Sequence, residues 1–221
     1  MKRRTFIALG AGAAMAAALS LPEFGGGQTK FAWAAEATEP AGSAAPAVIG
    51  TRKPLPAPDK SGGVPLMQAL AERQSNRSFN DAKLIDDQTL SNLLWATWGV
   101  NRPNGKHTAP TGRDRQKLAV YAALPDGIWF YNAKEHSLEL VVAGDRREDL
   151  GDAPLVLLYS AGDSEWGPME IGALYQNAGL FCASAGLSNV VKAQHLSDAR
   201  EILPLPKGYS IIITQSVGWP G

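Results

Sequence analysis

Residues 171–185 read IGALYQNAGLFCASA, and this stretch decides the fold class. Apolar side chains recur in it every three or four positions, which is the period of a helix. They are Ile171, Leu174, Tyr175, Ala178, Phe181, Cys182 and Ala185. Because the segment is apolar nearly all round, we expect a buried helix at the centre of the domain. Gly186 follows directly and is suited to end a helix.

Short strand-like segments lie on either side of this helix in the sequence. Residues 154–160, PLVLLYS, form a continuous apolar run that is typical of a central strand. The other expected strands cover 118–123, 127–132, 137–142, 188–191 and 209–217. Helices are expected over 66–74, 86–99 and 198–203, the second capped by Asp86 and ended by Gly99. Together these segments predict one α+β domain over residues 65–221.

Two polar segments could bind a ligand. Residues 101–116 form a long loop rich in Gly, Pro and Arg, and loops of that length inside a compact domain are usually functional or mobile. Its carboxylate, amide and guanidinium groups could hold the polar edge of a heterocycle, since such an edge carries N–H donors and carbonyl acceptors. A solvated basic loop would have the same composition, so both interpretations remain open.

The second segment is RQSNRSF, residues 73–79. If it is extended, Arg73, Ser75 and Arg77 lie on one face, where two guanidinium groups and a hydroxyl would suit a phosphate. The alternative is a set of solvated basic residues favourably placed at the carboxyl end of a helix. Spacing alone favours that alternative.

The first 35 residues predict an export signal. Arg3 and Arg4 precede an apolar run, 6–21, which is too short and weakly apolar for a stable membrane span of about 20 residues. Residues 32–34, Ala-Trp-Ala, fit a signal peptidase site. The paired arginines resemble the twin-arginine signal, which predicts a periplasmic protein. An ordinary secretory signal or an uncleaved anchor remains the alternative.

Residues 36–64 are rich in Pro and Ala and predict an extended linker or arm. Without residues 1–35 the chain keeps 17 of its 21 basic and 20 of its 21 acidic side chains, a net charge of −3. This charge argues against a nucleic-acid-binding protein, which usually carries a basic excess. Cys182 is the one cysteine of the chain, which rules out an internal disulfide and a Cys-based zinc site.

Known catalytic and metal-binding patterns are absent from the sequence. It has no nucleophile elbow, phosphate-binding loop or zinc-protease motif, and its three histidines lack the spacing of metal ligands. We therefore predict no metal site. Cys182 lies in the apolar helix, where a buried structural thiol is expected rather than a nucleophile.

Several short motifs, in order along the chain, resemble the nitroreductase superfamily of flavoproteins, including its thiazole-oxazole dehydrogenase-like members. They are residues 72–79 (ERQSNRSF), 93–102 (LLWATWGVNR), 108–111 (TAPT), 176–180 (QNAGL), 185–187 (AGL), 190–193 (VVKA) and 217–220 (VGWP). The resemblance runs from about residue 65 to the end. It implies an α+β fold in which helices flank a central antiparallel sheet, with one buried central helix.

The resemblance also implies a homodimer with one FMN per subunit, bound in a cleft at the subunit interface. Carried over by position, Arg73, Gln74, Ser75 and Arg77 would hold the phosphate and ribityl chain. Pro110, Thr111, Asp114 and Gln116 would line the pyrimidine side of the ring. The backbone at Lys192 and Ala193 would approach flavin N5.

The function implied is that of an FMN-dependent oxidoreductase. A donor reduces the flavin and leaves, and a small organic acceptor is then reduced in the same pocket by hydride transfer through flavin N5. The resemblance implies that no side chain must act as acid or base, so no catalytic residue is predicted. Export would separate the protein from cytoplasmic NAD(P)H, so an electron donor in the periplasm is expected.

Asp114 stands where the family usually has Asn. Its charge is expected to disfavour the anionic reduced flavin. With the absence of basic residues after Gly221, Asp114 motivates an alternative, a flavin-free family member that binds a small molecule or a partner protein. A protein that fragments the flavin ring, as some relatives do, is a third hypothesis.

Overall fold

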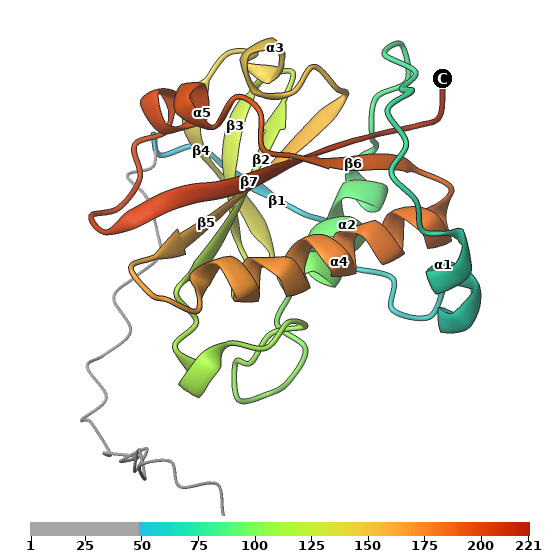
Figure 1. Cartoon of the computed structure of the whole chain (residues 1–221), viewed down its shortest axis with the longest axis horizontal. Coiled ribbons are helices and arrows are strands. Elements are labelled where there is room, and N and C mark those ends of the chain that lie inside the picture. Colours follow the sequence, from blue (N-terminus) through green and yellow to red (C-terminus); the bar gives the residue numbers. More distant parts are fainter. Residues whose placement is uncertain (1–48) are drawn as a thin grey trace, which may run out of the picture. The chain divides into compact units, whose positions relative to one another are not determined.

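A computed structural model describes residues 49–221 of the protein (Figure 1). The predicted export signal, residues 1–35, lies outside the described residues. So does the first part of the predicted arm, residues 36–48.

A seven-stranded sheet forms the centre of the domain, and every pair of neighbouring strands is antiparallel. The strand order is β1-β4-β3-β2-β5-β7-β6. The strands are β1 (Arg52–Pro54), β2 (Leu118–Leu124), β3 (Gly127–Asn132), β4 (Ser137–Ala143), β5 (Leu155–Gly162), β6 (Ser188–Lys192) and β7 (Tyr209–Gly218). The six strands expected from the sequence are therefore present, and β1 is an addition.

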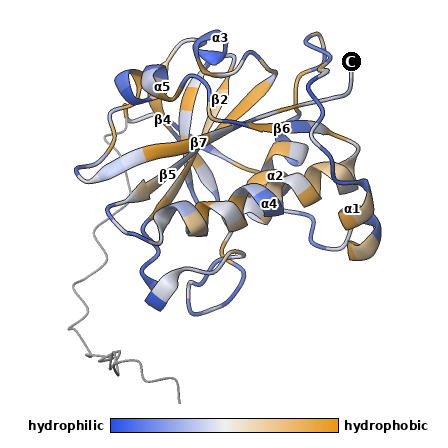
Figure 2. Ribbon diagram, in the orientation of Figure 1, coloured by the Kyte–Doolittle hydropathy of each residue, from blue (hydrophilic) through white to orange (hydrophobic). Residues whose placement is uncertain are grey.

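The helices pack on both faces of the sheet. They are α1 (Leu66–Glu72), α2 (Asp87–Trp98), α3 (Arg147–Leu150), α4 (Gly167–Ala185) and α5 (Leu196–Ile202). Side chains of α2 and α4 pack with Val120 and Ala122 of β2, whereas those of α3 and α5 pack with Ala119 and Tyr121. Because neighbouring residues of a strand point to opposite faces, β2 separates two apolar cores. Figure 2 shows hydrophobic residues along the strands between these helices.

The α4 helix confirms the central helix predicted from residues 171–185. Ile171, Leu174, Ala178 and Cys182 are buried on its sheet side. Gly186 ends it in the left-handed conformation, with φ of 70°, which is the reason that a glycine stands there. The opposite side of α4 is partly exposed in this chain, and Met169 is 63% exposed.

The α2 helix begins as predicted, because the Asp86 carboxylate accepts hydrogen bonds from the backbone N–H groups of Gln88 and Thr89. At the other end the reason for Gly99 differs from the expected one. Its backbone is extended rather than left-handed. A Cβ atom at this position would collide with the Trp95 ring and carbonyl, so Gly99 is needed for the close approach of the chain.

Part of the predicted arm belongs to the domain. Residues 52–54 pair with β4 as the edge strand β1, and Leu55 is buried in the core beside α2. The described residues of the domain therefore begin before position 65, the boundary expected from composition. Proline and alanine enrichment could not reveal this strand, because its three residues show no alternating pattern.

Within residues 49–221 no helix is long and apolar enough to span a membrane. The same residues hold no cluster of His, Cys, Asp and Glu that could bind a metal. Cys182 is buried in α4, and burial raises the pKa of its thiol. The prediction that it is a buried structural thiol is thus confirmed.

Candidate functional site

A pocket of about 200 Å³ lies at the long loop between α2 and β2. It is lined by Trp98, Arg102, Lys106, His107, Ala109, Pro110, Thr111, Asp114 and Gln116. The structure therefore brings together all four residues that were expected on the pyrimidine side of a flavin. We call Pro110, Thr111, Asp114 and Gln116 the ring group. Their contact with a flavin stays a prediction.

The backbone of this loop is held in an unusual conformation. Arg113, Asp114 and Gln116 have φ values of 54°, 56° and 50°, in the left-handed region that non-glycine residues seldom occupy. Gly112 N–H donates to Glu170 Oε1 at 2.6 Å, which fixes the loop to the start of α4. Backbone strain of this kind persists only where the surroundings hold it, and it is common at ligand sites.

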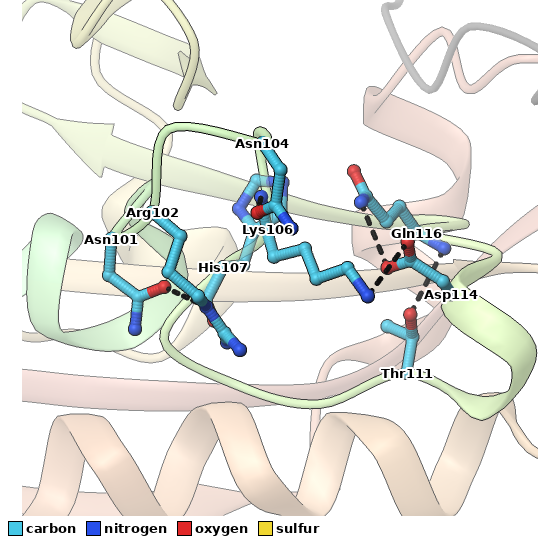
Figure 3. Close-up of polar contacts among 8 residues, drawn as sticks. All are labelled: Asn101, Arg102, Asn104, Lys106, His107, Thr111, Asp114 and Gln116. Atoms are coloured by element: carbon cyan, nitrogen blue, oxygen red, sulfur yellow. Dashed lines mark hydrogen bonds and ion pairs between the residues drawn. The ribbon is translucent and has the colours of Figure 1, made fainter.

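Asp114 is surrounded by groups that stabilise its negative charge (Figure 3). Its carboxylate accepts from Gln116 Nε2 at 3.1 Å and lies 3.4 Å from Lys106 Nζ. The hydrogen bond from Gln116, followed by the charges of Lys106 and Arg102, lowers the pKa of Asp114. Asp114 is therefore ionised at neutral pH, and a cation lies beside it.

Trp98 and His107 form an aromatic wall of the same pocket. Their rings stack with centroids 3.8 Å apart and an angle of 6° between the planes. His107 Nδ1 lies 2.7 Å from the Trp98 carbonyl oxygen, so Nδ1 carries the proton and donates it. Burial lowers the pKa of His107, which favours the neutral imidazole.

The sequence did not identify Trp98, Arg102, Lys106 or His107 individually as site residues, although the last three lie in the loop of residues 101–116. A usable signal was present in Pro103-Asn104-Gly105, a combination typical of a turn. The chain reverses there, because Gly105 N–H donates to the Arg102 carbonyl and Val100 pairs with His107. This reversal is what brings His107 back onto Trp98.

The remaining predicted residues lie along the edge strand β6. We call Arg73, Gln74, Ser75 and Arg77, with Lys192 and Ala193, the edge group. Asn76 N–H donates to the Asn189 carbonyl of β6 at 2.8 Å, which sets residues 73–77 beside that strand. The stem of Arg73 lies over Gly179 of α4, where a Cβ atom would be 3.7 Å from Arg73 Cγ.

Gln74 lies apart from the rest of the edge group. With Glu72 and Asn76 it lines a separate pocket of about 170 Å³. Because side chains alternate along an extended segment, this fits the expected common face of Arg73, Ser75 and Arg77. The contact of Gln74 with a cofactor stays a prediction.

Lys192 is tied to the turn that precedes β5. Its Nζ donates to the Gly151 carbonyl at 2.7 Å, and Thr214 Oγ1 donates to the Lys192 carbonyl at 3.1 Å. Burial lowers the pKa of Lys192, and the charge of Arg77 lowers it further against the opposing charge of Asp152. Arg77 and Lys192 thus place two positive charges in this region, and the carboxylate of Asp152 partly offsets them.

Within the described chain the pocket of the ring group does not reach the edge group. The pocket of the ring group contains no residue of the edge group. Figure 1 shows the loop of the ring group below α4 and the segment after α1 on its other side. Along α4 the two contact points, Glu170 and Gly179, are nine residues apart, or about 13 Å.

The side chains of each group nevertheless fit one end of FMN chemically. The polar edge of a flavin offers an N–H donor and two carbonyl acceptors, and Asp114 accepts while Gln116 and Lys106 can donate. Arginine forks bind phosphate in a bidentate manner, and Arg73 and Arg77 supply two of them. The residues present therefore fit FMN chemically. The ring group fits the polar edge of the flavin, and the arginines of the edge group fit the phosphate.

Comparisons with known proteins bear on the family of the chain. The sequence model of the nitroreductase family matches residues 70–219. The protein of Methanocaldococcus jannaschii named "putative nitroreductase MJ1384" is 28% identical over 178 residues, which cover 68% of this chain and 89% of that protein. A crystal structure from Ralstonia eutropha, with the same description of a putative nitroreductase, is 34% identical. The match covers 83% of this chain and 98% of the chain in that structure, with a TM-score of 0.71.

A more distant likeness concerns the fold alone. The Escherichia coli microcin synthetase McbBCD complex contains a chain that is 20% identical, with a TM-score of 0.59. The match covers 68% of this chain and 70% of that chain.

Proposed function

The chain belongs to the nitroreductase family, and from that premise we propose that it is an exported FMN-dependent oxidoreductase that reduces a small organic acceptor. The observation that carries the proposal is the presence of two chemically distinct groups on one chain, one suited to a flavin ring edge and one to a phosphate. FMN, when bound, supplies the two-electron chemistry, taking a hydride equivalent from a donor and giving it to an acceptor.

The side chains of the chain would bind and orient the cofactor. Asp114 and Gln116 would hydrogen-bond the polar edge of the ring, and Arg73 and Arg77 would bind the phosphate. The backbone at Lys192 and Ala193 is proposed to lie near the reacting nitrogen. No side chain is assigned a proton-transfer role, and His107, the histidine of the pocket, is partly buried, favoured in its neutral form and bonded through Nδ1.

We further propose that the working form is a homodimer. The two groups lie in different places on one chain, and a second copy could place the ring group of one subunit beside the edge group of the other. Exposed apolar side chains near both ends of α4 support an interface there. They are Leu66, Met67, Leu70, Trp166 and Met169.

The proposal that the protein is exported rests on residues 1–35, whose paired arginines resemble a twin-arginine signal. That route carries folded proteins, which suits a protein that loads its cofactor before export. The proposed donor is then a periplasmic reductant rather than cytoplasmic NAD(P)H.

FMN uptake tests the function directly. The purified protein is incubated with FMN, freed of unbound flavin, and its visible absorption is recorded before and after dithionite. We expect flavin bands that bleach on reduction and return in air. An Arg77→Gln variant should bind FMN about 10- to 100-fold more weakly, which corresponds to the loss of about 1.5–3 kcal/mol for a hydrogen bond to a charged group.

Lys207→Gln is the matched control, because Lys207 is an exposed basic residue in the turn before β7. It should bind FMN as the unmodified protein does. If the unmodified protein takes up no flavin, the proposal fails and the flavin-free alternative replaces it.

A further inference from the structure

Asp114 and Lys106 form an ion pair inside the pocket of the ring group. Lys106 Nζ lies 3.4 Å from Asp114 Oδ2, and both side chains also line the pocket. Gln116 Nε2 donates to the other carboxylate oxygen at 3.1 Å. The carboxylate therefore presents its acceptor atoms to the pocket with a cation directly beside it.

The position of Lys106 is set by the turn before it. Gly105 N–H donates to the Arg102 carbonyl at 3.0 Å, and Asn101 N–H donates to the Lys106 carbonyl at 3.0 Å. The Arg102 side chain is engaged elsewhere, with Nε on Asn101 Oδ1 and one terminal nitrogen on the His107 carbonyl, both at 2.8 Å. Lys106, by contrast, lies within ion-pair distance of Asp114.

An uncompensated carboxylate at this place would oppose reduction of a flavin. Oxidised FMN takes up two electrons and one proton, so the bound ring gains one negative charge. A second negative charge beside it raises the energy of the reduced form relative to the oxidised form. The sequence alone led to that expectation for Asp114.

We propose that Lys106 is a positioning and charge-compensating residue, which holds the Asp114 carboxylate at the ring edge and offsets its charge so that reduced FMN is accepted. The inference rests on the proposed function and names two residues on which the redox balance of that site depends. On this proposal the charge of Asp114 no longer opposes reduction, because Lys106 neutralises it and Arg102 adds a further positive charge to the same pocket.

The effect should be larger with the cofactor bound than in the free protein. Both side chains are about half exposed, 41% for Lys106 and 49% for Asp114, and exposed ion pairs contribute little in water. A ligand in the pocket excludes water from it, and charges interact more strongly where water is excluded.

The test compares the affinities of the protein for oxidised and reduced FMN. The dissociation constant for oxidised FMN comes from flavin fluorescence, and the midpoint potentials of free and bound FMN, measured anaerobically, give the ratio of the two affinities. We expect Lys106→Met to weaken reduced FMN about tenfold more than oxidised FMN. That ratio equals a potential about 30 mV lower for a two-electron couple.

Asp114→Asn should shift the ratio in the opposite direction, and the double variant should return it close to that of the unmodified protein. Lys134→Met is the matched control, because Lys134 is exposed in the turn between β3 and β4. It should leave the ratio unchanged.

Each other outcome has a definite meaning. A Lys106→Met variant that weakens both redox forms equally, or neither, overturns the inference while leaving FMN function intact. In that case Lys106 only supports the loop, or does nothing for the site. A protein that binds no FMN at all overturns the proposed function, and the inference with it.

Discussion

His136 links the described part of the arm to the sheet. Its Nε2 lies 3.0 Å from the Pro56 carbonyl, and its Nδ1 lies 2.9 Å from the Tyr131 hydroxyl. Ser91 Oγ donates to the same carbonyl at 2.6 Å and lies 2.7 Å from Nε2, so Nε2 carries the proton and faces two acceptor oxygens, while Nδ1 accepts from the tyrosine. Burial lowers the pKa of His136, so the folded protein holds this imidazole neutral.

This arrangement predicts a loss of stability in mild acid. The folded pKa values of His136 and His107 are lowered from 6.5, so the unfolded chain takes up protons first as the pH falls. Stability is therefore complete above about pH 6.5 and decreases below it, by at most about 1.4 kcal/mol per pH unit for each histidine. Urea unfolding at several pH values measures the slope.

A His136→Gln variant should show a shallower decrease below pH 6.5, with the part due to His107 remaining. The control is His195→Gln, at an exposed position before α5. An equal slope in the His136→Gln variant and the unmodified protein would contradict this assignment.

Single residues differ in how much their sequence context could tell. Asp86 and Gly186 were predictable, since a cap is a local feature of the helix they bound. Asp114 was predictable as a carboxylate in the loop but not as one half of an ion pair, because Lys106 approaches it only after the chain reverses at Gly105.

At the scale of elements, periodicity located the long ones. The expected strand at 127–132 matches β3, and the expected helix at 171–185 lies within α4. The missed elements, β1 and α3, have three and four residues, which is too short for any period to appear. Both are held by contacts with distant parts of the chain: β1 pairs with β4, and α3 packs against α5.

The edge strand β1 predicts where the domain can be shortened. A chain of residues 49–221 keeps β1, Leu55 and the Pro56 carbonyl, whereas residues 65–221 lack all three. Burial of one leucine is worth about 2–3 kcal/mol, so we expect the shorter chain to be less stable by about 3 kcal/mol or more. Urea unfolding of both chains measures the difference.

Leu55→Ala in the longer chain provides an independent comparison. It should lower the free energy of unfolding by about 2–5 kcal/mol, as for other buried leucines. Equal unfolding midpoints for the two truncated chains would show that β1 contributes nothing to the domain.

At the scale of the whole molecule, the distribution of the two groups matters most. The sequence predicted the residues of both groups but could not say that they lie in different places on one chain. That separation depends on the packing of α4 between them, which is a tertiary property. The sequence likewise did not indicate that Met67 and Leu70 of α1 would remain exposed.

The proposed dimer predicts the effect of charges on α1. Met67 is 75% and Leu70 is 44% exposed, so the double variant Met67→Lys and Leu70→Lys should fold normally as a single chain. We expect it to be monomeric by light scattering and to bind FMN at least tenfold more weakly, a loss of about 1.4 kcal/mol or more. Circular dichroism checks the fold.

Leu84→Lys is the control, because Leu84 is a 52% exposed apolar residue outside α1 and α4. It should remain dimeric. Finding the α1 variant dimeric, or the unmodified protein monomeric with full FMN affinity, would rule out this interface.

The hydrogen bond from Asn76 N–H to β6 makes the hydrogen-exchange rate of this amide a measure of local opening at the edge group. Residues 73–77 are joined to the edge strand through this N–H, and it can exchange its proton with water only when the segment leaves β6. The rate at which this N–H exchanges with deuterium therefore reports how often the segment that carries the proposed phosphate-binding arginines separates from β6. A ligand that bridges Arg77 and Lys192 would slow that exchange without any change in the unfolding of the core.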